Sequence, residues 1–106
     1  MDEPTFDKDG YPTEETLEAI RQWDGSDLKG LLPFAEEAFV HRFGKWQKIG
    51  NTLRLATRGW SGCESVIDAL ADNFIFWTTC WILTRRGGLF LFEIPSPEGG
   101  KNDEPV

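Results

Sequence analysis

Apolar side chains recur at helical spacing soon after the start of the chain. Leu17, Ile20 and Trp23 lie three residues apart on one face of a helix, and Thr13 before them suits an N-cap. The pattern therefore predicts a helix from about Thr13 to Trp23. Residues 1–10 are polar and acidic, contain a proline and a glycine, and are predicted to form a flexible lead-in.

A second helical series follows the turn at 24–26. Either Ser26 or Asp27 suits its cap. Because proline is tolerated only in the first turn of a helix, Pro33 leaves two possibilities open: the regular helix starts near Leu32, or a short turn over 27–30 precedes it. The apolar positions of this series are Leu31, Leu32, Phe34, Ala35, Ala38, Phe39 and Phe43.

A third helix is predicted from Gly62 to about Asn73, with Val66, Ile67 and Leu70 facing inward. Ser61 and Glu64 have the spacing of a capping box, in which each side chain bonds the backbone N–H of the other residue. This spacing predicts that Ser61 is the N-cap.

The pattern between the second and third helices changes to alternation, which predicts a hairpin of residues 45–49 and 52–58. Gly50 and Asn51 form its turn, and glycine in the first of two turn positions favours type II′. One face of this hairpin is apolar and the other cationic. The expected cross-strand pairs are Trp46 with Leu55 and Gln47 with Arg54.

The end of the chain predicts a second hairpin. Residues 76–84 are rich in aromatic and β-branched side chains, which favours a strand, although a longer helix is the alternative. Gly87-Gly88 would form the turn, and residues 89–94 the last strand. The expected pairs are Leu83 with Phe92 and Trp81 with Ile94. Residues 96–106 lack the apolar side chains needed for order and are predicted to form a flexible acidic tail.

These elements predict an α+β fold in the order ααββαββ, with about four antiparallel strands covered by three helices. The chain has 106 residues, which suits a single domain over 11–95. Its composition is globular, and five tryptophans and eight phenylalanines indicate an aromatic core.

Charge is distributed unevenly along the chain, whose net charge is -7. Residues 1–40 carry eleven acidic and three basic side chains, whereas residues 41–95 carry four acidic and seven basic ones. The overall negative charge disfavours direct nucleic-acid binding. The acidic half suggests instead a surface that resembles a DNA backbone and binds a cationic groove. Its candidate residues are Glu14, Glu15, Glu18, Asp24, Asp27, Glu36 and Glu37.

The sequence predicts neither a metal site nor a cofactor. Cys63 and Cys80 lack the spacing of metal ligands, and free thiols are the simpler interpretation. The start of the chain lacks the basic and apolar segments of a signal peptide, so we expect a cytoplasmic protein. The longest apolar stretch, residues 74–83, is about half as long as a membrane helix requires.

No catalytic residue is predicted. Cys63 lies at the start of a helix, which favours the thiolate, but nothing in the sequence places His41 beside it as a base. The loop at 59–62 is the most distinctive site, because free N–H groups at a helix start can receive an anion or contact a partner. The candidate partner-binding residues are Arg58, Trp60, Ser61, Gly62, Arg85 and Arg86.

The chain resembles small uncharacterised proteins carried by bacteriophages and prophages. The motifs that carry the resemblance are Gly59-Trp60-Ser61-Gly62, Arg85-Arg86-Gly87-Gly88, the segment Tyr11 to Trp23 and the segment Gly30 to Leu32. It covers about residues 10–94. The resemblance implies a viral accessory protein, and phage proteins of this size often bind a host factor, including factors of antiviral defence.

The sequence-based hypothesis is therefore a non-enzymatic phage accessory protein that binds and modulates a host or phage protein. Two alternatives stay open at this point. One is a small ligand-binding or enzymatic domain that uses the loop from Trp60 to Cys63. The other is a structural phage protein that assembles with itself, for example through an unpaired edge strand. The oligomeric state is not predicted.

Overall fold

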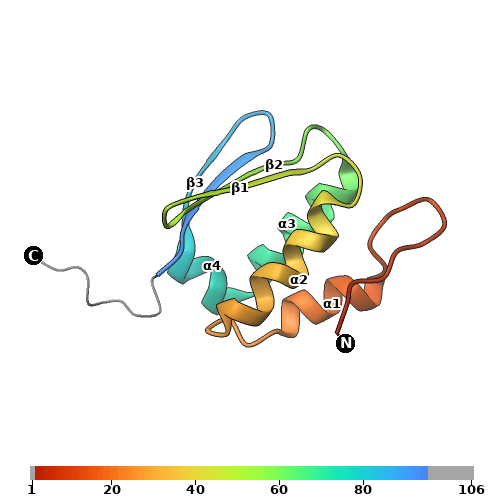
Figure 1. Ribbon diagram of the computed structural model, residues 1–106, viewed down its shortest axis with the longest axis horizontal. Coiled ribbons are helices and arrows are strands. Elements are labelled where there is room, and N and C mark those ends of the chain that lie inside the picture. Colours follow the sequence, from red (N-terminus) through yellow and green to blue (C-terminus); the bar gives the residue numbers. More distant parts are fainter. Residues whose placement is uncertain (1, 96–106) are drawn as a thin grey trace, which may run out of the picture.

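The computed structural model describes residues 2–95 (Figure 1). Within this range the chain forms four helices and four strands in the order ααββααββ. Their bounds are α1 Glu14–Gln22, α2 Leu28–Val40, β1 Lys45–Ile49, β2 Thr52–Ala56, α3 Ser61–Asp72, α4 Phe74–Cys80, β3 Trp81–Arg85 and β4 Leu89–Glu93. The predicted tail of residues 96–106 lies outside the described range.

The four strands form one antiparallel sheet in the order β1-β2-β4-β3. The helices lie on one side of this sheet, so the molecule has two layers (Figure 1). This arrangement confirms the α+β class and the antiparallel sheet. The predicted count of three helices is wrong, because the described residues contain a fourth helix, α4. β1 and β3 are the two edge strands of the sheet.

The first hairpin has the predicted register. Trp46 pairs with Leu55 and Gln47 with Arg54. The turn between the strands has a positive φ at Gly50 (61°) but not at Asn51, which is the pattern of a type II′ turn. Alternation and turn chemistry are both local properties, and they were enough to set this register.

The second hairpin differs from the prediction. Residues 74–80 form helix α4, so the strand starts at Trp81 and not near residue 76. Within the sheet, Trp81 pairs with Phe92 and Leu83 with Leu91, and a bulge at Ile82 shifts the register between them. The expected pairs of Leu83 with Phe92 and of Trp81 with Ile94 are therefore wrong.

Asn73 is the reason that residues 74–80 start a new helix instead of a strand. Its Oδ1 accepts a hydrogen bond from the backbone N–H of Phe76 (3.3 Å), which caps α4. Its Nδ2 donates to the carbonyls of Ile20 and Trp23 at the end of α1, at 2.9 Å each. One buried side chain thus joins the end of α1 to the start of α4. Asn73 had been predicted only to end the third helix.

Helix α2 runs from Leu28 through Pro33 without a break, so a start near Leu32 and a separate turn over 27–30 are both wrong, whereas the predicted cap at Asp27 is confirmed. Asp27 is the cap, and its Oδ1 accepts from the N–H of Gly30 (3.2 Å). A proline inside a helix costs about 3 kcal/mol. Each large apolar side chain that the same helix buries stabilises the folded state by about 1.5–3 kcal/mol. Burial therefore outweighs the lost hydrogen bond; the buried residues are Leu31, Phe34, Ala35, Ala38 and Phe39.

The segment before α1 is attached to that helix by hydrogen bonds. The N–H of Thr5 donates to Oγ1 of Thr16 (2.7 Å), and the N–H of Thr13 donates to the carbonyl of Thr5 (3.0 Å). Phe6 and Pro12 form an isolated β-bridge. Thr5, within the predicted lead-in of residues 1–10, is therefore hydrogen-bonded to α1 and its cap.

The core lies between the sheet and the helices. Leu53, Leu55 and Phe92 from the sheet are fully buried, as are Phe39 from α2 and Phe76 from α4. The predicted inward positions of α3, Val66, Ile67 and Leu70, are all buried. This core fixes α4 against the sheet and so positions the exposed residues described below.

Candidate functional site

The turn after β2 and the turn between β3 and β4 meet at one end of the sheet. Together they carry the three predicted partner-binding arginines. The backbone N–H of Thr57, after β2, donates to the carbonyl of Gly88 in the β3–β4 turn (3.0 Å). Arg58 follows Thr57 directly, and Arg85 and Arg86 precede Gly88 by a few residues. The structure thus brings the Trp60 loop and the second hairpin turn to the same end of the sheet, which no sequence pattern had predicted.

Arg58 has an unusual backbone conformation. Its φ of 56° is the only positive value at a non-glycine residue among the described residues. A side-chain-bearing residue in this region costs about 1–3 kcal/mol and is often found where a loop serves a function. Gly59 follows with φ 80° and has open space around it. The strained turn presents the Arg58 side chain, which is exposed, at the end of the sheet.

Trp60 is partly buried and acts mainly as a packing residue. Its ring lies 5.1 Å from that of Tyr11 and 5.8 Å from that of Phe43, measured between centroids. It also covers Gly62 so closely that a Cβ at Gly62 would overlap the ring. Ser61 Oγ donates to the hydroxyl of Tyr11 (3.3 Å). Three of the predicted partner-binding residues, Trp60, Ser61 and Gly62, are therefore engaged within the fold.

The predicted capping box is wrong. Helix α3 begins at Ser61, its N-cap is Trp60, and no side chain caps it. The carbonyl of Trp60 instead accepts from the N–H groups of Cys63 (3.0 Å) and Glu64 (3.2 Å). The Ser61 hydroxyl instead donates to the Tyr11 hydroxyl, a contact between residues far apart in sequence.

Cys63 has the properties of a core residue. It is fully buried, and its Sγ donates to the carbonyl of Phe39 (3.2 Å). Burial raises the pKa of the Cys63 thiol to about 11, so the thiol is protonated at neutral pH. His41 stacks on Phe6, with 3.6 Å between the ring centroids. The sulfur therefore lacks the thiolate character that a nucleophile requires.

Because the two cysteine thiols are buried and protonated, we expect reagents to modify them slowly in the folded protein. Cys80 is also buried, and burial raises its pKa to about 11. At pH 7.5 both thiols should react with Ellman's reagent only as fast as the protein unfolds, whereas in guanidinium both should react at once. Because the folded-state pKa exceeds that of the unfolded chain, the free energy of unfolding should fall as the pH rises from about 9 to about 11. Rapid labelling of the native protein would contradict this prediction.

All seven residues of the predicted acidic surface are exposed, and several of them have partners within the fold. Glu14 and Glu18 accept from Nη1 of Arg21 at 2.9 and 2.7 Å, so their charges are shared with a cation. Hydrogen bonds from Ser26 hold the pKa of Asp24 below its ordinary value. Asp27 caps α2 and also accepts from Nε1 of Trp23 (3.0 Å). Glu15, Glu36 and Glu37 are also exposed.

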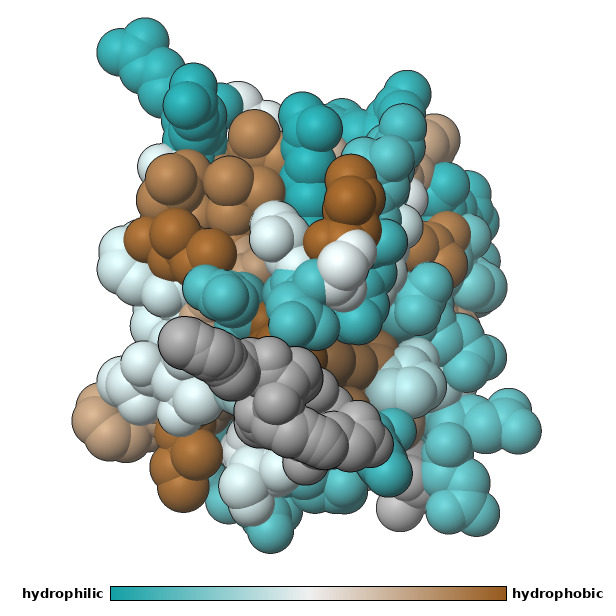
Figure 2. All heavy atoms as spheres, turned by 60° about the vertical axis from the view of Figure 1, so that its left-hand side comes forward, coloured by the Kyte–Doolittle hydropathy of each residue, from teal (hydrophilic) through white to brown (hydrophobic). Residues whose placement is uncertain are grey.

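The structure shows an apolar surface that sequence reasoning missed. Four large side chains on α4 and β3 are exposed: Phe74 by 74%, Ile75 by 54%, Trp81 by 42% and Ile82 by 45%. We call them the α4–β3 patch. Figure 2 shows several separate apolar areas among hydrophilic ones on this side of the molecule. The signal that could have revealed it is Asn73, a strong N-cap residue placed directly before the apolar run.

The described residues contain no group of three or more His, Cys, Asp or Glu side chains arranged to hold a metal ion. Among residues 2–95, no helix has the length and hydrophobicity needed to cross a membrane. Comparison of the chain with protein-family models, with curated proteins and with solved structures found no match.

Proposed function

We propose that this chain is a non-enzymatic accessory protein of phage origin that binds a host protein through the α4–β3 patch. The observation that carries the proposal is the exposure of four large apolar side chains on two consecutive elements, α4 and β3: Phe74, Ile75, Trp81 and Ile82. Phe74 and Ile75 are adjacent at the start of α4, and Trp81 and Ile82 are adjacent at the start of β3. Exposed apolar side chains that gather on a surface commonly mark a binding site. Aromatic side chains and arginine are the residue types enriched at energetically important interface positions.

The position of the patch supports the same proposal. β3 is an edge strand, so within residues 2–95 its outer edge pairs with no other strand. The strand begins at Trp81 in the patch and ends at Arg85, beside Arg86 in the turn. A partner lying along β3 would therefore meet apolar residues first and arginines at the far end. A fitting partner has an apolar surface with acidic residues at one side.

The proposed phage origin, and a role as an inhibitor of an antiviral defence factor, rest on the sequence motifs described above. A binding protein without catalytic groups inhibits by occupying a surface that its target needs. The buried, protonated Cys63 supports a role without thiol chemistry. This mode of action requires only affinity and a rigid patch, and the core contacts of α4 provide the rigidity.

A pull-down with matched variants tests this proposal. The tagged protein would be incubated with lysate of the bacterial host, and retained proteins identified by mass spectrometry. We expect a stoichiometric partner that is lost with Phe74→Ala and weakened with Arg85→Glu. Phe43→Ala is the matched control. Phe43 is also exposed (55%), but its ring contacts Trp60 in the loop before α3 and does not belong to the α4–β3 patch. Loss of a single hot-spot side chain is expected to weaken binding at least about thirtyfold.

The two variants separate the possible surfaces. If Phe43→Ala abolishes binding and Phe74→Ala does not, the partner binds near Trp60, and the α4–β3 patch is the wrong surface. If binding survives both substitutions but disappears at high salt, the acidic residues of α1 and α2 are the contact instead. Absence of any stoichiometric partner in host lysate would count against the proposed function as a whole.

A further inference from the structure

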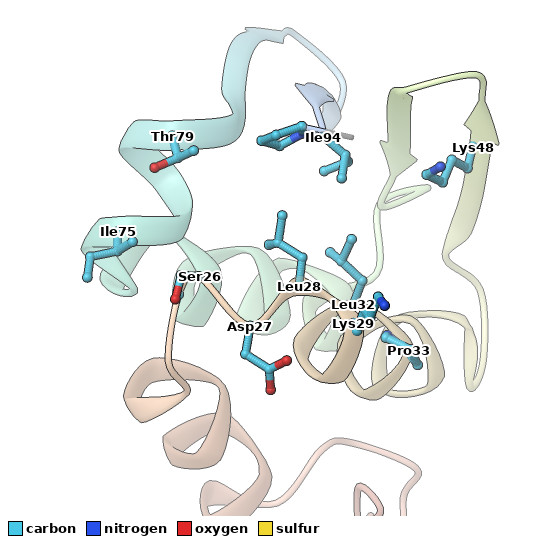
Figure 3. A pocket seen from close by; sticks show the side chains of 12 residues that line it. Ser26, Asp27, Leu28, Lys29, Leu32, Pro33, Lys48, Ile75, Thr79 and Ile94 are labelled. Atoms are coloured by element: carbon cyan, nitrogen blue, oxygen red, sulfur yellow. The ribbon is translucent and has the colours of Figure 1, made fainter. Parts of the chain in front are cut away.

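A cavity of about 640 Å³ lies between the start of α2, helix α4 and the residues that follow β4 (Figure 3). Its apolar lining comes from three separate parts of the fold: Leu28, Leu32 and Pro33 from α2, Ile75 from α4, and Ile94 after β4. Leu28 and Leu32 point up into the space, and Ile94 points toward them from the opposite side (Figure 3). The volume falls within the range of small-molecule sites, about 300–1,000 Å³.

Two lysines also line the cavity, Lys29 from α2 and Lys48 from β1. Lys48 pairs with the buried Leu53, so its side chain lies on the helix-covered face of the sheet, unlike that of Lys45. The Lys48 ammonium donates one hydrogen bond to the carbonyl of Gly50 (3.0 Å). An ammonium has three N–H donors, so this group retains the capacity to bond an anion.

Asp27 is the acidic residue of the lining, and its carboxylate is directed away from the apolar part of the cavity. The Asp27 side chain points away from Leu28 and Leu32 (Figure 3). Its two oxygens accept hydrogen bonds from the N–H of Gly30 and from Nε1 of Trp23. Lys29 and Lys48 therefore supply the positive charges of the lining, and the Asp27 carboxylate points away from the leucines.

We propose that this cavity binds a small amphipathic carboxylate, with its alkyl or aryl body against the leucines and isoleucines and its carboxylate at Lys48 and Lys29. The apolar walls take up the body of the ligand, and charge complementarity selects an anionic head group over a neutral or cationic one. The inference is independent of the proposed partner binding, although Ile75 belongs both to the cavity and to the α4–β3 patch.

Titration with ligands of matched chain length tests the chemistry of the site. Sodium decanoate, decanol and decyltrimethylammonium would be added below their aggregation concentrations, with binding followed by calorimetry and by methyl NMR of the full chain. We expect saturable 1:1 binding of decanoate with a Kd below about 1 mM and affinity about five- to tenfold above that of decanol. Shifts should be largest for the methyl groups of Leu28, Leu32 and Ile94.

Two pairs of variants locate the site. Lys48→Ala should weaken decanoate binding about fivefold, while Lys45→Ala, on the opposite face of the same strand, should leave it unchanged. Thr79→Trp should fill the cavity and weaken binding more than about tenfold, while Thr78→Trp, on the same helix but outside the lining, should not. Lys48→Glu keeps the cavity open and should reverse the preference toward decyltrimethylammonium.

Three results would overturn the inference. The first is no saturable binding of decanoate below about 1 mM. The second is equal affinity for decanoate and decanol, which would remove the argument from charge. The third is methyl shifts centred on Ile82 instead of Leu28 and Leu32, which would place the ligand on the α4–β3 patch. None of these results depends on the capture of a host protein, so this inference and the proposed function fail separately.

Discussion

Replacing Phe76 with alanine should lower the free energy of unfolding by about 4 kcal/mol, whereas Phe74→Ala should change it by no more than about 0.5 kcal/mol. Phe76 is fully buried, and its ring lies 5.4 Å from that of Phe92 in the sheet. Its removal leaves a cavity between α4 and β4. Phe74 is 74% exposed and leaves no cavity. Urea denaturation followed by circular dichroism measures both values.

The same pair of variants distinguishes a helix from a strand in residues 74–80. Side chains two positions apart share a face of a strand but point in different directions from a helix. If Phe74 and Phe76 were in a strand, the two substitutions would have similar effects. Equal destabilisation would therefore contradict helix α4 and the exposure of Phe74, and with them the basis of the α4–β3 patch.

Asn73→Ala should lower the free energy of unfolding by about 3–4 kcal/mol. The buried side chain makes three hydrogen bonds, to the carbonyls of Ile20 and Trp23 and from the N–H of Phe76. Each bond contributes about 1 kcal/mol, and backbone groups left without a partner in the interior add a further cost. The substitution should also loosen α4 first, which amide hydrogen exchange at Phe76 would detect.

The neighbouring Asp72→Ala is the matched control for Asn73→Ala. The Asp72 side chain is 67% exposed, and its Oδ2 lies 3.7 Å from Nε of Arg21, which is long for an ion pair. An exposed ion pair contributes about 0–1 kcal/mol, so the control should remain close to the parent protein. A loss of less than about 1 kcal/mol for Asn73→Ala would show that the hydrogen bonds between α1 and α4 contribute little.

The candidate site was predictable only in part. The arginines at 58, 85 and 86 could be proposed because each lies in or beside a glycine-containing turn, where a side chain is expected to be exposed. Their location at one end of the sheet depends on the Thr57–Gly88 hydrogen bond, which joins residues far apart in sequence. Trp60 was proposed as a contact residue, but Tyr11 and Phe43 pack against it. Such packing cannot be read from local spacing.

Local patterns in the sequence were sufficient for the α+β class, helix α1 and its Thr13 cap, the inward face of α3, and the register of the first hairpin. In each case, periodicity and a cap or turn residue act within a few positions of one another. Such short-range signals need no information from the rest of the chain.

The local Asn73 cap and tertiary contacts together decided the path of residues 73–83. An aromatic and β-branched run fits a strand by propensity, but Asn73 bonds the end of α1 and caps a new helix, and Phe76 is then buried against Phe92. Burial also kept α2 continuous through Pro33, and α2, α4 and the end of β4 together enclose the cavity. These outcomes depend on contacts between distant segments, whose free energy exceeds the roughly 1 kcal/mol scale of local strand preference.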